Sequence, residues 1–129
     1  DAARLAVEPE DRAALIDALI LCKFLRGVFK DLFGESAEML EAVTGWEVTG
    51  GELRAIAKRV VALKKAYNIR EGWTPAADTL PERFLTQPLP EGGALSRERL
   101  ASMVTAYNLA RGWSPDGYVP ESQMKDMGL

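Results

Sequence analysis

The feature that most constrains this chain is an apolar run at residues 13–22, AALIDALILC. Asp17 is the only charged residue in the run, and Cys22, which ends it, is the only cysteine in the chain. A helical segment without a polar face is expected to be buried on all sides. Because a buried carboxylate is costly unless another group pairs with it, Asp17 needs a partner from elsewhere in the protein.

Size and composition are those of one globular domain, with 129 residues of which 47% are hydrophobic and 27% charged. The net charge of -3 gives no general attraction to nucleic acid or to anionic membranes. Charged residues interrupt the longest apolar stretch well before the roughly 18 residues that a membrane-spanning helix needs. We therefore expect neither a nucleic-acid partner nor a membrane.

Histidine is absent from the sequence, and cysteine occurs once. The lack of histidine excludes Ser-His-Asp and Cys-His catalysis, and histidine-based metal sites, within this chain. The single cysteine excludes an internal disulfide and indicates a reducing, cytoplasmic setting. Because the chain begins with Asp-Ala-Ala and has no signal peptide, we expect it to be a piece of a longer protein.

Hydrophobic periodicity predicts an all-α fold, an irregular helical domain of about four to six helices with a long Pro-rich loop. The loop is expected at residues 73–94, with a single helical turn started by Pro81. The expected helices span residues 9–32, 37–43, 50–68, 97–111 and 120–128.

Capping residues set most of these boundaries. Thr49 and Glu52 form a capping-box pattern before the third helix, and Ser96 can cap the fourth. Pro9 suits the first turn of the long first helix, and Gly34 is a natural stop for it.

A ten-residue pattern occurs twice, as AYNIREGWTP at residues 66–75 and as AYNLARGWSP at residues 106–115. Each copy reads as a helix end, with glycine past the last turn and tryptophan folding back over it. Two copies are too few for a solenoid, so the pattern indicates one way of ending a helix that is used twice.

Two interpretations of Cys22 and Asp17 are open at this point. A lone cysteine in an apolar helix is most often a small core residue, and nothing except Lys23 lies near enough in sequence to activate it. Asp17 can lie at an edge and pair with Arg12, Arg26 or a lysine of another helix. In the alternative, the partners of both residues are missing from this chain.

Four blocks of sequence resemble one known family, in order and over nearly the whole chain. The blocks are DALILC at 17–22, AVTGWEVTGGEL at 42–53, AYNIREGWTPAADTLPERFLTQPLP at 66–90 and LARGWSPDGYVP at 109–120. The family that they resemble is the C-terminal part of the tungsten-containing aldehyde:ferredoxin oxidoreductases. The resemblance implies that residues 1–129 are the C-terminal helical domain of a larger oxidoreductase.

The resemblance also implies cofactors and site residues. Enzymes of this family oxidise aldehydes to carboxylic acids at a tungsten, or sometimes molybdenum, bis-pterin centre, and pass electrons through a 4Fe-4S cluster to ferredoxin. Their Asp-x-x-Gly-Leu-Cys segment matches Asp17, Leu21 and Cys22. Cys22 would be the fourth metal ligand of the cluster, and Asp17 would hydrogen-bond a pterin.

One position departs from that segment, because Ile20 stands where the family has glycine. Residues five apart on a straight helix also point about 140° away from each other. If Asp17 and Cys22 serve one cofactor assembly, the helix should break or bend between them.

The resemblance further implies that the isolated chain binds no cofactor, is not catalytic and packs against upstream domains of the same protein. Alone, it is expected to cover its apolar segment, residues 13–33, by self-association. Two alternatives remain: a tungsten enzyme of the same family acting on another substrate, such as an aromatic-ring thioester, or a non-catalytic helical interaction module.

Overall fold

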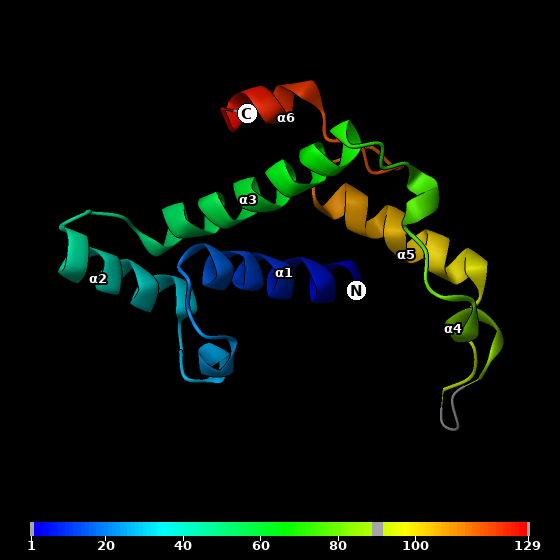
Figure 1. The fold of residues 1–129 in the computed structure, drawn as a ribbon, viewed down its shortest axis with the longest axis horizontal. Helices are drawn as coiled ribbons and strands as arrows, with labels where there is room; N and C mark the ends of the chain where they lie inside the picture. Colours follow the sequence, from blue (N-terminus) through cyan, green and yellow to red (C-terminus); the bar gives the residue numbers. More distant parts are fainter. Residues whose placement is uncertain (1, 89–91, 129) are drawn as a thin grey trace. The chain divides into compact units, whose positions relative to one another are not determined.

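The computed structural model describes residues 2–88 and 92–128, and it is all-α, as the sequence predicts (Figure 1). Those residues contain six α-helices, two short 3-10 helices and no β-strand. The α-helices are α1 (Ala2–Ala18), α2 (Leu32–Thr44), α3 (Gly50–Arg70), α4 (Glu82–Thr86), α5 (Arg97–Ala110) and α6 (Glu121–Asp126). The 3-10 helices are η1 (Lys23–Gly27) and η2 (Pro75–Ala77). Within the described residues, no helix combines the length and the apolar character needed to cross a bilayer.

The chain divides into two compact units, one of residues 8–64 and one that combines residues 1–7 with 65–129. The first unit holds most of the buried apolar side chains, and they come from α1, α2 and α3. Its core comprises Ala14, Leu15, Ile16, Leu32, Phe33, Ala37, Leu53, Ala57, Val61 and Ala62.

The predicted helix over residues 9–32 is wrong at both ends. α1 begins at Ala2, so Pro9 lies inside it, and it ends at Ala18. The chain then turns and forms η1, a separate 3-10 helix. The early stop comes from Ile20, whose backbone has φ of 56°, in the left-handed region that ends helices.

The predicted short helix at residues 37–43 starts too late, because α2 begins at Leu32 and includes Gly34. Glu35 favours the earlier start, since its carboxylate accepts a hydrogen bond from the Asp31 backbone N–H at 2.8 Å. Gly45 closes α2 with φ of 70°.

The capping box at the start of α3 is confirmed. The Thr49 backbone N–H donates to Glu52 Oε2 at 2.8 Å, and the Glu52 N–H donates to Thr49 Oγ1 at 3.2 Å. The hydrogen bonds from the Thr49 backbone and, next, from its hydroxyl hold the pKa of Glu52 below its usual value. Ser96 caps α5 as predicted, since its Oγ accepts from the Arg99 N–H.

In the second unit, the Pro-rich loop is fixed to α3 by Lys65. The Lys65 ammonium lies 3.1 Å from the centroid of the Trp73 ring and 3.3 Å from Asp78 Oδ2. Trp73 Nε1 donates to the other oxygen of Asp78 at 3.0 Å. The Lys65 side chain is nearly buried, and it therefore makes both a cation–π contact with Trp73 and an ion pair with Asp78.

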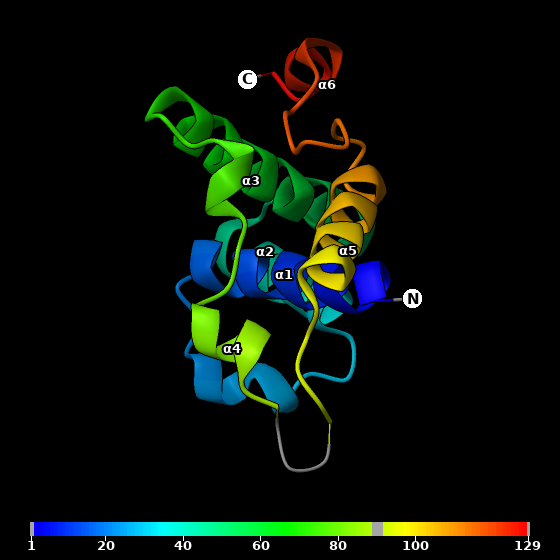
Figure 2. The ribbon, with the colours of Figure 1, turned by 90° about the vertical axis from the view of Figure 1, so that its right-hand side faces the viewer.

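The single turn after Pro81 is α4, and the chain returns past it toward α5 (Figure 2). The Leu95 N–H donates to the Phe84 carbonyl at 3.4 Å, which joins the two arms of this loop. The predicted loop over residues 73–94 includes positions 89–91, which lie outside the described residues.

The repeated sequence pattern gives the same helix end twice. The Trp73 N–H donates to the Asn68 carbonyl at 2.8 Å, and the Trp113 N–H donates to the Asn108 carbonyl at 2.9 Å. Gly72 and Gly112 precede the tryptophans, with φ of 95° and 74°. Both ends are Schellman motifs, in which a residue with positive φ lets the next N–H bond back across five residues.

Candidate functional site

The segment that carries Asp17, Leu21 and Cys22 is a third Schellman motif, formed without glycine. The Leu21 N–H donates to the Ile16 carbonyl at 2.9 Å, and the Ile20 N–H donates to the Asp17 carbonyl at 3.2 Å. Ile20 takes the position with positive φ that Gly72 and Gly112 occupy in the other two motifs. The helix therefore breaks between Asp17 and Cys22, which is the condition for both residues to serve one cofactor assembly.

After the break, Cys22 leaves the helix in an extended conformation, with φ of -64° and ψ of 127°. Its carbonyl accepts from the Leu25 N–H at 2.9 Å, the bond that opens η1. The thiol is free and exposed. Backbone hydrogen bonds on both sides of Cys22 thus define the conformation in which the thiol is presented.

Asp17 lies on the last turn of α1 with its side chain 48% exposed. The nearest cation is Lys23, whose Nζ is 3.7 Å from Asp17 Oδ1. An exposed ion pair at that distance contributes little stability. The Asp17 carboxylate is therefore able to accept further hydrogen bonds. Leu21, which precedes Cys22 in sequence, is partly buried.

The expectation that residues 13–22 are buried on all sides is wrong for the second half of the run. Ala14, Leu15 and Ile16 are in the core, but Asp17, Ile20 and Cys22 are exposed. The helix end at Ala18 explains the exposure of Ile20 and Cys22, because the residues after it no longer follow the buried face of α1. Asp17 lies within α1, on the exposed side of its last turn.

Exposed apolar side chains surround Cys22 in sequence, and we call Ile20, Phe24, Leu25 and Val28 the apolar shoulder. Ile20 is 91% exposed and Phe24 is 96% exposed. Large apolar side chains exposed on one short segment are typical of an interface or a ligand site.

The donor chemistry of this segment fits one part of an iron–sulfur site. A cysteine thiolate is the usual ligand of such clusters, and four ligands complete one. Cys22 supplies one accessible thiol, and the Asp17 carboxylate can accept hydrogen bonds from a ring N–H. Among residues 2–88 and 92–128, no group of three or more His, Cys, Asp or Glu side chains could hold a metal ion. The other ligands would have to come from elsewhere in the protein.

Sequence reasoning missed a second feature, a pocket between α1 and η1 to which Arg12, Lys23 and Arg26 contribute. The sequence suggests Arg12 and Arg26 only as partners for Asp17. A continuous helix would place them about 21 Å apart along its axis, at 1.5 Å per residue. No signal in the sequence indicates that Arg12 and Arg26 line one pocket unless the break at Ile20 is known.

Comparison with known proteins gives one family match over the whole chain. The family described as "Aldehyde ferredoxin oxidoreductase, domains 2 & 3" matches residues 1–129. Three relatives carry the name "Tungsten-containing aldehyde ferredoxin oxidoreductase". The protein of Pyrococcus horikoshii is 34% identical over 93% of this chain, and that of Pyrococcus furiosus is 33% identical over 100%. The protein of Thermococcus kodakarensis is 36% identical over 93% of this chain.

These relatives are much longer than the chain. The matched region covers 20% of the Pyrococcus horikoshii and Thermococcus kodakarensis proteins and 21% of the Pyrococcus furiosus protein. The chain therefore spans about a fifth of the length of the curated relatives it matches.

Proposed function

Since the chain belongs to the aldehyde ferredoxin oxidoreductase family, we propose that it is the C-terminal domain of a tungsten-containing enzyme that oxidises aldehydes to carboxylic acids. The names of the relatives support tungsten as the metal of the whole protein. Ferredoxin, or another electron-transfer protein, is the proposed electron acceptor. The isolated domain is not catalytic, and upstream domains of the same chain are its first partner.

Within that enzyme, Cys22 acts as one ligand of a 4Fe-4S cluster, and Asp17 hydrogen-bonds a pterin. When bound, the metal centres supply the two-electron oxidation and carry the electrons away. The single observation that carries this assignment is the end of α1 at Ile20. It leaves the carboxylate on the helix and releases the thiol from it, so the two side chains are not held on opposite faces of one helix.

The residues around Cys22 have supporting roles. The Schellman bonds fix the backbone from Asp17 to Leu21, so the thiolate needs little ordering when it binds iron. Ile20 and Phe24, which flank Cys22 in sequence, exclude water from the ligand in the assembled enzyme, and solvent exposure is one of the quantities that sets a cluster's reduction potential. An accessible thiol with this role suits a reducing compartment, and we propose a cytoplasmic location.

Metal analysis of the full-length protein tests the proposal. The full-length polypeptide that contains residues 1–129 is purified anaerobically as wild type, as Cys22→Ser and as Val28→Ser. Val28→Ser is the matched control, because it introduces the same residue on the same exposed segment and keeps the thiol. We expect about four irons per chain, with tungsten or molybdenum, in the wild type and in Val28→Ser.

We expect Cys22→Ser to lose iron and the electron paramagnetic resonance signal of the reduced cluster while keeping its circular dichroism spectrum. If Cys22→Ser keeps all its iron and the signal, Cys22 is not a cluster ligand. If the wild type contains no metal above trace, the enzyme assignment fails and a non-catalytic helical module is the better description.

Substrate class is tested on the same preparation. Reduction of ferredoxin that depends on an added aldehyde supports aldehyde oxidation. The same metal content without aldehyde turnover, together with reduction of an aromatic thioester, would support the other activity expected within this family.

A further inference from the structure

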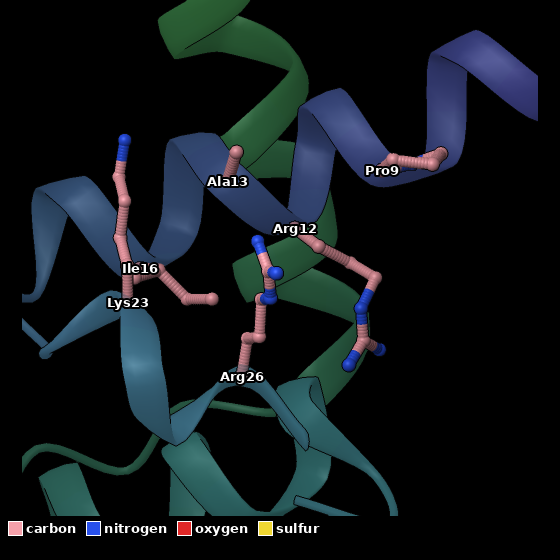
Figure 3. Close-up of a pocket in the computed structure, with 6 residues that line it drawn as sticks. All are labelled: Pro9, Arg12, Ala13, Ile16, Lys23 and Arg26. Atoms are coloured by element: carbon pink, nitrogen blue, oxygen red, sulfur yellow. The ribbon is translucent and has the colours of Figure 1, made fainter.

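A pocket of about 350 Å³ lies in the unit of residues 8–64, where η1 folds back beside α1. Pro9, Arg12, Ala13 and Ile16 of α1 line it, together with Lys23 and Arg26 of η1. Figure 3 shows Arg26 extending from η1 toward α1, with the side chain of Ile16 directed toward it. One wall is therefore apolar, and three cationic side chains border it.

The positive charge at this pocket is not balanced by the part of the chain that the structure describes. Arg12 and Arg26 form no hydrogen bond or ion pair with any residue in the ranges 2–88 and 92–128. Lys23 has only the weak contact of 3.7 Å with Asp17. The Lys23 ammonium extends away from Arg12 and Arg26 (Figure 3), so the excess at the pocket is the two positive charges of the guanidinium groups.

We propose that this pocket binds the phosphate group of a small phosphate monoester, with the organic part of the ligand against Pro9, Ala13 and Ile16. Guanidinium groups recognise phosphate oxygens with pairs of parallel hydrogen bonds, and two guanidinium groups are available here. A phosphate monoester carries a charge between about -1.5 and -2 at neutral pH, which matches the excess positive charge. A carboxylate would neutralise only half of that excess.

The pocket also has the size of a small-molecule site. Ligand pockets usually measure about 300–1,000 Å³ and combine an apolar lining with a few placed polar groups. A nucleic acid would instead need an extended basic stripe with aromatic side chains. The inference does not depend on the function proposed above, because it uses neither Cys22 nor any metal.

Isothermal titration calorimetry at low ionic strength tests this inference on the full-length polypeptide that contains residues 1–129. The probes are inorganic phosphate, phenyl phosphate and, as the carboxylate comparison, benzoate. We expect one saturable site for phosphate, tighter binding of phenyl phosphate and the weakest binding for benzoate. Phenyl phosphate should gain about threefold or more, because its ring buries apolar surface against the pocket wall.

The variants are Arg12→Gln and Arg26→Gln, with Arg59→Gln as the matched control. Arg59 is an exposed cation of α3 that does not line the pocket. Losing one charge-assisted partner should raise Kd for phenyl phosphate about tenfold or more in each pocket variant. Arg59→Gln should bind as the wild type does. Arg26 is exposed, so its replacement tests binding even if Arg12→Gln affects folding.

Three results would overturn the inference. The first is the absence of saturable phosphate binding by the wild type. The second is equal weakening by Arg59→Gln, which would show non-specific charge attraction. The third is benzoate binding as tight as that of phenyl phosphate, which would assign the pocket to carboxylates.

Discussion

Replacing Ile20 by glycine should increase the free energy of unfolding of this chain by about 1 kcal/mol. Ile20 has φ of 56°, and a left-handed conformation costs an L-residue about 1–2 kcal/mol, with β-branched residues at the upper end. Glycine removes that cost, but it loses about 0.5–1 kcal/mol more conformational entropy on folding. The Ile20 side chain is 91% exposed in the single chain, so its removal sacrifices almost no apolar burial at a protein concentration that keeps the chain monomeric.

Urea unfolding followed by circular dichroism measures this change. With a slope of about 2 kcal/mol per molar urea, the midpoint should rise by about 0.5 M in Ile20→Gly. Ile20→Ala is the control, because alanine shortens the side chain but keeps the Cβ atom that makes positive φ unfavourable. It should raise the midpoint by less than Ile20→Gly does, because alanine loses only the additional cost of the β-branch.

The reverse change is available at Gly72, which has φ of 95° in the same motif and nothing within 4 Å of an added Cβ atom. Gly72→Ala should therefore lower the free energy of unfolding by about 1 kcal/mol without a steric clash. The reasoning is refuted if Ile20→Ala stabilises the chain as much as Ile20→Gly does. A lower midpoint for Ile20→Gly would refute it as well.

Three further predictions concern other parts of the chain. Lys65→Met should lower the free energy of unfolding by about 2 kcal/mol, because it removes a cation that is 11% exposed and contacts both Trp73 and Asp78. Lys64→Met, at the exposed neighbouring position, is the control and should change the free energy of unfolding little. Thermal unfolding of both variants measures the difference. The pKa of Glu52 is lowered in the folded state, so its contribution to stability is complete above the unfolded pKa of about 4.5 and is lost as the pH falls through the lower folded value. Glu52→Gln should therefore flatten the acid limb of the stability curve, and identical limbs in the two proteins would contradict this. The isolated chain should self-associate through its apolar shoulder. In sedimentation equilibrium, the double variant Phe24→Ser and Val28→Ser should associate more weakly than the wild type. A monomeric wild type would refute the prediction.

Local signals in the sequence were sufficient for the fold class and for several helix boundaries. The Thr49–Glu52 capping box, the Ser96 cap and the glycines after α2, α3 and α5 each act within a few residues. Their effect depends on hydrogen bonds between near neighbours, so no knowledge of the tertiary structure is needed to read them.

The end of α1 could not be predicted in the same way. Glycine and asparagine usually mark a Schellman motif, and isoleucine is among the least suitable residues for positive φ. Residues 13–22 therefore read as continuous helix from composition alone, and only the family resemblance indicated a break. The start of α1 was missed for a related reason, because Pro9 is typical of a first turn but lies inside the helix here.

The pocket could not be predicted for the same reason. Its two walls come from α1 and η1, which the sequence reads as one helix. A site made by the fold-back of two elements is visible only when the turn between them is known. The assignment of Asp17, Leu21 and Cys22 as site residues, by contrast, rests on a family motif, which carries information that periodicity does not contain, and it stays a prediction.

The turn after α1 also has a consequence for the order of folding. Its two backbone hydrogen bonds span three and five residues, so they close on the timescale of helix formation, which is about a microsecond. Contacts between α1 and α3 must bring together residues far apart in the chain, which takes longer. The backbone that presents Cys22 can therefore take its native path as soon as α1 exists. In pulse-labelling hydrogen exchange during refolding, the Leu21 amide should then become protected together with the α1 amides rather than with those of α3.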